Sequence, residues 1–265
     1  MLEVSRLRRE RRSGGKTDAL DAVRAARSVL TEQRPSIARA GGERQSLQAL
    51  VAAREGAVNA QRAGLCQLRD LLITTPEPLR SEPRPLTRAR LLQRLAAARP
   101  HGRQDPELRG SMLALRSIAR RILQLTAEER ELAREIETIT RTLAPQLLDQ
   151  PGVRPHAAAQ LVLSWSHQGR IISEAACARL AGAAPIPASS GQTVRYRLDR
   201  SGDRKLNHAL HMILITRKRT DPATITYIER RTQEGKTRRE ANRCLKRYLA
   251  HSLYRLLEHG APAAT

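Results

Sequence analysis

The sequence of 265 residues contains no phenylalanine, one tryptophan and four tyrosines. RRM and OB modules bind nucleic acid by stacking its bases on exposed aromatic side chains, so this composition argues against both classes. A core without these rings must be built from leucine, isoleucine, valine and alanine, which suits packed helices. The composition therefore predicts a mainly α-helical protein.

Cysteine is scarce as well. Cys66, Cys177 and Cys244 are odd in number and lie too far apart to form a CxxC pair, which argues against a disulfide framework and a zinc knuckle. No apolar run approaches the length of a membrane span, and the first residues lack the apolar core of a signal peptide. We therefore expect a soluble, cytoplasmic protein with no membrane partner.

Negatively charged residues are also few relative to positively charged ones. Aspartate and glutamate total 26 against 48 lysines and arginines, which gives a formal net charge of +22. Only five of the 48 are lysines, and codon bias in a GC-rich genome can produce this excess of arginine over lysine. Because such bias exchanges lysine for arginine, it cannot create the net charge. The charge predicts a polyanionic partner, nucleic acid above all. Binding to acidic lipid and a merely well-solvated surface are the weaker alternatives.

Two long helices are predicted, one from residue 43 and one from residue 106 to residue 144, with a proline-rich linker at 74–86 between them. Apolar residues recur in both at steps of three and four, which is typical of a coiled-coil seam, with Arg54 and Gln61 as polar exceptions. The pattern predicts a coiled-coil region over 43–145 and leaves open whether its helices pair within one chain or between subunits. The seam residues are Leu47, Val51, Val58, Leu65, Leu68 and Leu72 in the first helix and Leu108, Met112, Leu115, Ile118, Ile122, Leu125, Leu132, Ile136, Ile139 and Leu143 in the second.

Residues 146–260 have shorter predicted elements, and we expect them to form a helical C-terminal domain. The turn at 151–155 is similar to that of a helix-hairpin-helix, whose backbone N–H groups face a phosphate. Gly152 and Arg154 are the nucleic-acid-binding candidates in this turn, and Arg154 stands where such turns often have a second glycine. An ordinary turn between two helices explains the same residues equally well.

Two groups of residues are candidates for chemistry. Asp18 and Asp21 lie three residues apart, so on a helix both carboxylates project from one face and can bind one divalent cation. The alternative is that Asp18 caps the helix and Asp21 is solvated.

The second group is a Ser-Ser-Gly loop beside a run of basic residues. Guanidinium groups can clamp a phosphate and stabilise the charge that develops when a serine hydroxyl, here that of Ser189 or Ser190, attacks it. A loop of this composition is more often only a turn. The basic residues are Arg195, Arg197, Arg200, Arg204 and Lys205.

Two motifs in this chain resemble a known family. Residues 15–22, GKTDALDA, resemble the GKTDxxDA motif of the DEDD insertion-sequence transposases. Residues 184–191, APIPASSG, and residues 201–204, SGDR, are similar to the C-terminal transposase domain of the same family. These proteins are the bridge-RNA-guided recombinases of the insertion-sequence one-ten family, which are related to pilin-gene invertases. The resemblance covers essentially the whole chain.

The resemblance implies a RuvC-like domain with four acidic residues, a coiled coil, and a C-terminal domain whose serine attacks DNA. By motif, Asp18 and Asp21 match the last two acidic residues and would bind magnesium. Ser190 matches the nucleophile, with Ser189 as the alternate. DNA and a guide RNA are the implied partners, in a homo-oligomer where the acidic site of one subunit meets the serine of another.

In the family, the first Asp and the Glu lie on strands upstream of the GKTD motif, whereas this sequence begins close to this motif. Glu3 and Glu10 stand too near Asp18 to replace them. Residues 1–34 therefore resemble the remnant of a RuvC-like domain in an N-terminally truncated copy, and we expect little or no cleavage by this chain alone. The rival hypothesis is a non-catalytic nucleic-acid-binding remnant that retains only the arginines and the coiled coil.

Overall fold

The structure is a computed structural model that describes residues 2–3, 19, 22–23, 26–27, 30, 36–77, 79–81, 86–100, 105–187, 196–199 and 202–260. The predicted α-helical class is confirmed, because helices make up nearly all the regular structure. The strands are short: β1 (Leu2–Glu3) pairs antiparallel with β2 (Ser36–Ile37), and β3 (Pro185–Pro187) with β4 (Tyr196–Leu198). None of the described helices combines the length and the apolar character needed to cross a bilayer. The chain divides into two compact units, one of residues 47–139 and one of residues 1–46 and 140–265.

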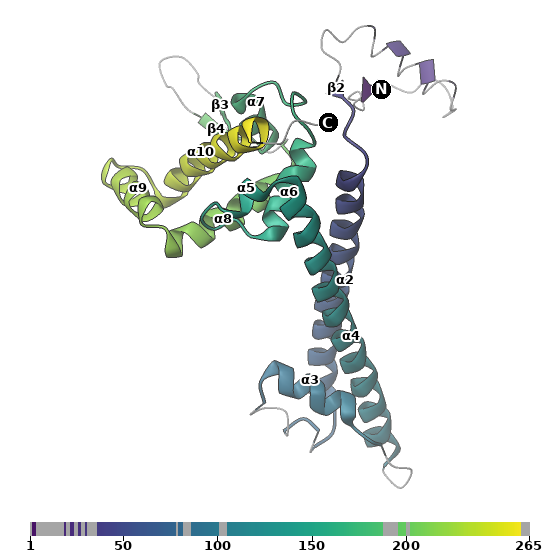
Figure 1. The fold of residues 1–265 in the computed structure, drawn as a ribbon. Coiled ribbons are helices and arrows are strands. Elements are labelled where there is room, and N and C mark those ends of the chain that lie inside the picture. The colour runs from purple at the N-terminus through teal and green to yellow at the C-terminus, as the bar shows by residue number, and fades with distance from the viewer. Residues whose placement is uncertain are drawn as a thin grey trace. The chain divides into compact units, whose positions relative to one another are not determined.

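The unit of residues 47–139, called the arm below, is built from α2 (Glu43–Thr74), α3 (Arg88–Ala97) and α4 (Pro106–Leu143) (Figure 1). Gln61 pairs with Thr126, and Gln67 pairs with Arg121. Residue numbers thus rise along α2 as they fall along α4, so the two helices run antiparallel. The seam left the choice of partner open, and the structure shows the pairing within one chain.

The core of the arm is formed by apolar residues from all three helices. A Cβ added to Gly64 would lie only 3.0 Å from Ile122 Cγ1, so the absence of a side chain there lets α2 and α4 approach closely. One buried cluster of this core, to which each of the three helices contributes, is formed by Leu68, Leu92, Leu95, Leu115, Ala119 and Ile122.

The two polar exceptions in the seam of α2 each meet a polar partner on α4. Gln61 Nε2 donates to Thr126 Oγ1 at 2.6 Å, and Arg54 forms an ion pair with Glu129. Polar groups inside an apolar seam fix the register of paired helices, because any other register leaves them without partners. These contacts therefore explain how polar residues are tolerated at seam positions.

The residues from Thr140 onward form a second group of helices, and several begin at side-chain caps. Ser173, Asp203 and Asp221 cap α7, α8 and α9, and Thr237 forms a capping box with Glu240 at the start of α10. The helices are α5 (Pro145–Leu148), α6 (Pro155–Trp165), α7 (Glu174–Leu180), α8 (Arg204–Thr220), α9 (Pro222–Gln233) and α10 (Arg238–His259).

Helix α6 lies at the centre of this group, because every residue from Ala157 to Trp165 is buried. It packs against α5, α8 and α10, and α10 also contacts α7 and α9 (Figure 1). Glu258 on α10 accepts hydrogen bonds from Trp165 Nε1 at 2.8 Å and from Gly169 N at 2.6 Å. This carboxylate fastens the end of α6 to α10.

Candidate nucleic-acid interface

The predicted serine loop extends from the hairpin of β3 and β4. Pro185 lies opposite Leu198 at the base of this hairpin, and Pro187 lies opposite Tyr196 at its far end. The residues between Pro187 and Tyr196 are the predicted loop. The structure therefore describes the stem that carries the loop and the contacts that hold this stem.

All four predicted catalytic residues, Ser189, Ser190, Asp18 and Asp21, lie outside the described part of the chain. Two of the predicted phosphate contacts, Arg195 and Arg200, lie outside it as well. The backbone of Arg197 lies in β4, and its side chain belongs to the same undescribed set. Among the described residues, no three His, Cys, Asp or Glu side chains form a group that could hold a metal ion. The serine and metal roles stay predictions.

The segments on either side of the hairpin are held together by two glycines. A Cβ added to Gly202 would lie 2.5 Å from Gly182 N and 2.6 Å from Leu180 O, so any side chain at Gly202 would force the backbone apart. Gly182 has φ +61°, in the left-handed region that favours glycine. Asp203 N donates to Leu180 O at 2.6 Å. The end of α7 and the start of α8 are thus in backbone contact, and the hairpin arises between them.

Asp203 connects this junction to two helices. Its Oδ1 atom accepts hydrogen bonds from Lys205 N at 2.9 Å and Leu206 N at 3.1 Å, which caps α8. Its Oδ2 atom accepts one from Ser164 Oγ of α6 at 2.8 Å. Arg204 and Lys205, both predicted phosphate contacts, are exposed in the first turn of α8. The cap therefore presents two cationic side chains next to the base of the hairpin.

A second polar chain joins α10 to the same base. Lys246 Nζ donates to Asn207 Oδ1 at 2.7 Å, and Asn207 Nδ2 donates to Ala181 O at 2.6 Å. Burial lowers the pKa of Lys246. Sequence reasoning missed this pair, because Lys246 and Asn207 lie on separate helices and no local pattern links them. The chain fixes the residue next to Gly182 and so supports the glycine contact.

Positive charge gathers on α8 next to Lys246. Burial lowers the pKa of His211, and the nearby Lys246, His208 and Lys218 lower it further. Lys246 contacts Asn207, one turn before His211. His208 and Lys218 lie three and seven residues from His211 on α8, positions that share one helix face. These four side chains are called the α8 basic cluster below. The side chains of His208, His211 and Lys218 are exposed. A phosphate at this surface would be attracted by Lys218 and Lys246 and would favour the charged form of His211.

The turn at 151–155 connects α5 to α6 and packs against α8. Gly152 has φ +74°, and a Cβ there would lie 2.9 Å from Arg217 Cγ and 3.1 Å from Ile213 O. Arg217 Nε donates to Pro151 O at 2.7 Å, and burial lowers the pKa of Arg217. Close packing thus accounts for glycine at this position. Arg154 is exposed at the N-cap of α6, and phosphate binding by this turn stays a prediction.

This part of the chain also matches a known protein family. Residues 144–229 match the transposase IS116/IS110/IS902 family. The match begins just before α5, ends within α9 and includes the hairpin, the glycine contact and α8. The segment that carries the predicted serine loop is therefore similar to transposases.

Two curated relatives are proteins of insertion elements. The chain is 29% identical over 147 residues to a 43.6 kDa protein of insertion element IS110 from Streptomyces coelicolor, a match that covers 54% of this chain and 36% of the relative. It is 31% identical over 124 residues to a 42 kDa protein of insertion element IS900 from Mycobacterium paratuberculosis, covering 45% of this chain and 31% of the relative. The matches span about a third of each relative's length.

Proposed function

We propose that the chain acts in the transposition of an insertion element and binds DNA through its C-terminal helices. The match of residues 144–229 to the transposase family carries this proposal. The distribution of charge supports it, because residues 140–265 contain 21 lysines and arginines against nine aspartates and glutamates. Phosphate contacts should dominate binding. If about six phosphates are neutralised, log K falls with log salt at a slope near −5.

The proposed reaction is strand exchange through a phosphoserine link. Ser190 Oγ would attack a DNA phosphodiester, so that an O–P bond forms to the serine, the P–O bond to one deoxyribose breaks, and the leaving oxygen takes up a proton. Arg195, Arg197 and Arg200 follow the serine closely enough in sequence to clamp the phosphate. The fixed base of the hairpin supports this assignment, since a nucleophile must be held in place to react.

Asp18 and Asp21 are the proposed magnesium ligands. Carboxylate oxygens are the ligands that magnesium prefers in proteins, and the bound ion would promote loss of the serine proton and stabilise charge on the phosphate. From the resemblance to DEDD transposases we further propose that the chain binds a guide RNA and forms a homo-oligomer in which these aspartates meet the serine of another subunit. Asp18 and Asp21 are the two of the four implied acidic residues that the motif assigns in this chain.

The decisive experiment is a search for a covalent protein–DNA adduct. The full chain is mixed with insertion-element end DNA, magnesium, the guide RNA and a segment that supplies the other two acidic residues, and adducts are resolved on denaturing gels. We expect an adduct that disappears in Ser190→Ala and persists in the matched control Ser189→Ala. The reverse result would move the nucleophile by one residue, and an adduct that survives both changes would remove serine chemistry from this loop. DNA binding without an adduct under any condition would favour a non-catalytic DNA-binding protein.

A further inference from the structure

Two of the four tyrosines meet between α9 and α10. The rings of Tyr227 on α9 and Tyr248 on α10 have centroids 5.9 Å apart and an interplanar angle of 81°. This edge-to-face arrangement is a favoured geometry for aromatic pairs. Tyr248 nevertheless remains 60% exposed. One ring is therefore held by its neighbour while most of its own surface faces solvent.

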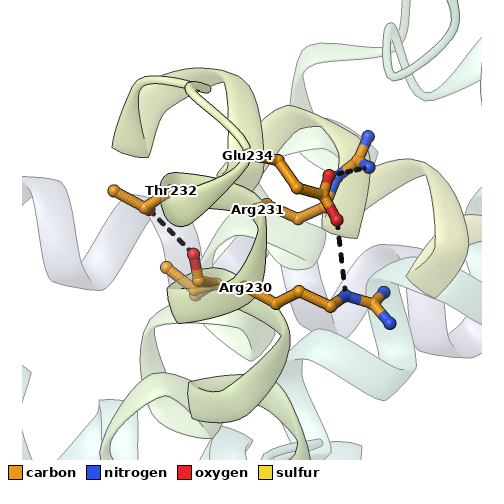
Figure 2. Close-up of polar contacts among 5 residues, drawn as sticks. Arg230, Arg231, Thr232 and Glu234 are labelled. Carbon is orange, nitrogen blue, oxygen red and sulfur yellow. Dashed lines mark hydrogen bonds and ion pairs between the residues drawn. The ribbon is translucent and has the colours of Figure 1, made fainter.

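The Tyr227 ring is in turn contacted by Arg230 in the last turn of α9. The Arg230 guanidinium carbon lies 5.5 Å from the centroid of the Tyr227 ring, within the range of a cation–π contact. Glu234 pairs with Arg230 at 3.7 Å and with Arg231 at 2.5 Å. Figure 2 shows the Glu234 carboxylate between the two guanidinium groups. The orientation of the exposed ring is thus set by contacts that start on the neighbouring helix.

The surface around Tyr248 is strongly cationic. Residues 221–247 contain eight lysines and arginines against four aspartates and glutamates. Three of the four acidic side chains are already engaged, since Asp221 and Glu240 act in helix caps and Glu234 pairs with arginines. Exposed arginines at positions 239, 243 and 247 recur every four residues along α10, which places them in one row about 6 Å apart along the axis. The row ends at Arg247, directly before Tyr248 in the chain. A helix that carries an exposed ring and this row suits a ligand with both flat rings and negative charge.

We propose that Tyr248 stacks on a base of an unpaired DNA strand whose phosphates follow the arginine row of α10. The strand must be unpaired, because duplex DNA presents only base edges in its grooves, whereas stacking requires an open base face. This inference rests on the proposed function for its choice of DNA, and it adds a substrate class, since strand exchange exposes unpaired segments. Tyr248 is assigned to binding, and the serine chemistry lies elsewhere.

The test compares short oligothymidine with a duplex of the same length, using the full chain and fluorescence anisotropy. Tyr248→Ala should weaken binding of oligothymidine on the order of tenfold, because loss of one stacked base typically has an effect of this size. Tyr248→Phe, which keeps the ring, should bind like the unchanged protein. Ile172→Ala removes another exposed apolar side chain, 72% exposed, and should leave both affinities unchanged. Equal melting temperatures establish that the variants fold.

Duplex binding separates this inference from the proposed function. Unchanged duplex binding in Tyr248→Ala, with the tenfold loss for oligothymidine, supports stacking. Equal losses for both ligands, or none for either, overturn it while leaving DNA binding by the chain intact. Oligouridine of the same length is measured as a third ligand. A loss of affinity in Tyr248→Ala that is confined to oligouridine would assign the ring to RNA and overturn the choice of DNA. If the unchanged protein binds neither DNA ligand, the proposed function itself fails.

Discussion

The arm and the C-terminal helices both form a core without phenylalanine, but different kinds of contact hold them together. The arm repeats one apolar seam along α2 and α4, and its 16 lysines and arginines are offset by 11 aspartates and glutamates in residues 47–139. The C-terminal residues 140–265 rely on contacts that occur once each, such as the glycine contact, the Asp203 cap and the chain from Lys246 to Ala181. Their basic residues exceed their acidic ones by 12.

The two regions therefore differ in where their stability is concentrated. A repeated seam distributes stability over many equivalent layers, so no single surface residue is essential. Single contacts around the hairpin concentrate stability where the predicted serine loop begins, beside the α8 basic cluster. We therefore expect substitutions to damage the arm in proportion to burial and to damage the C-terminal unit according to their distance from this junction.

The largest effect is expected from a charge in the arm's core. Ile122 is 1% exposed, and Ile122→Asp would bury a carboxylate among leucines without a partner, which should cost about 4 kcal/mol of the arm's free energy of unfolding. Leu113→Asp, at a position that is 39% exposed on the same helix, is the matched control and should change it little. Thermal unfolding followed by circular dichroism measures both. Equal losses in the two variants would contradict the assigned core.

The next largest effect compares one substitution at two glycines. Gly202→Ala places a Cβ 2.5 Å from Gly182 N, so the backbone must shift, and we expect a loss of about 3 kcal/mol in the C-terminal unit. Gly110 lies in α4 with no atom within 4 Å of its added Cβ, and Gly110→Ala should stabilise the arm by about 0.5 to 1 kcal/mol. Urea unfolding measures both changes. Changes of the same sign in the free energy of unfolding would contradict the distinction between Gly110, which has open space around it, and Gly202, which is in backbone contact.

The two long helices of the arm could be predicted because the pattern that indicates them is local and repeated. Leu47, Val51 and Leu68 are seam residues and are buried as expected. Farther along α2, Ala57 is buried while its neighbour Val58 is only partly so, since a helix of 3.6 residues per turn drifts from a seam with a period of 3.5. The partners of the two polar seam residues lie on α4, so no pattern within α2 predicted them.

The candidate site was predictable only in its local parts. The caps at Asp203 and Thr237 each join residues within four positions of each other, so a local pattern is enough to indicate them. The contact of Gly182 with Gly202 spans the whole hairpin, and the pair of Tyr227 and Tyr248 joins two helices. Such contacts depend on how the chain folds back on itself, and the residues involved carry no local signal.

The smallest expected effect concerns the proton on His211. Its pKa is lowered by burial and then by Lys246, His208 and Lys218, so the imidazole is neutral at pH 7. A phosphate bound at the α8 basic cluster would favour the charged imidazole and raise this pKa, so DNA binding should take up a proton. The gain in DNA affinity that this proton provides is absent well above pH 7 and grows as the pH falls. It is complete below the lowered pKa of His211 in the free protein.

The size of this effect follows from the exposure of the cluster. A solvent-exposed ion pair contributes about 0.5 kcal/mol, so the affinity for duplex DNA should rise about twofold on acidification, beyond any change seen in the variant His211→Gln. His259→Gln, at the exposed C-terminal end of α10, is the control and should keep the twofold rise. Binding measured in buffers of different ionisation enthalpy counts the protons taken up. The same proton uptake in His211→Gln as in the unchanged chain would show that the proton does not go to His211 and would contradict a phosphate bound next to this imidazole.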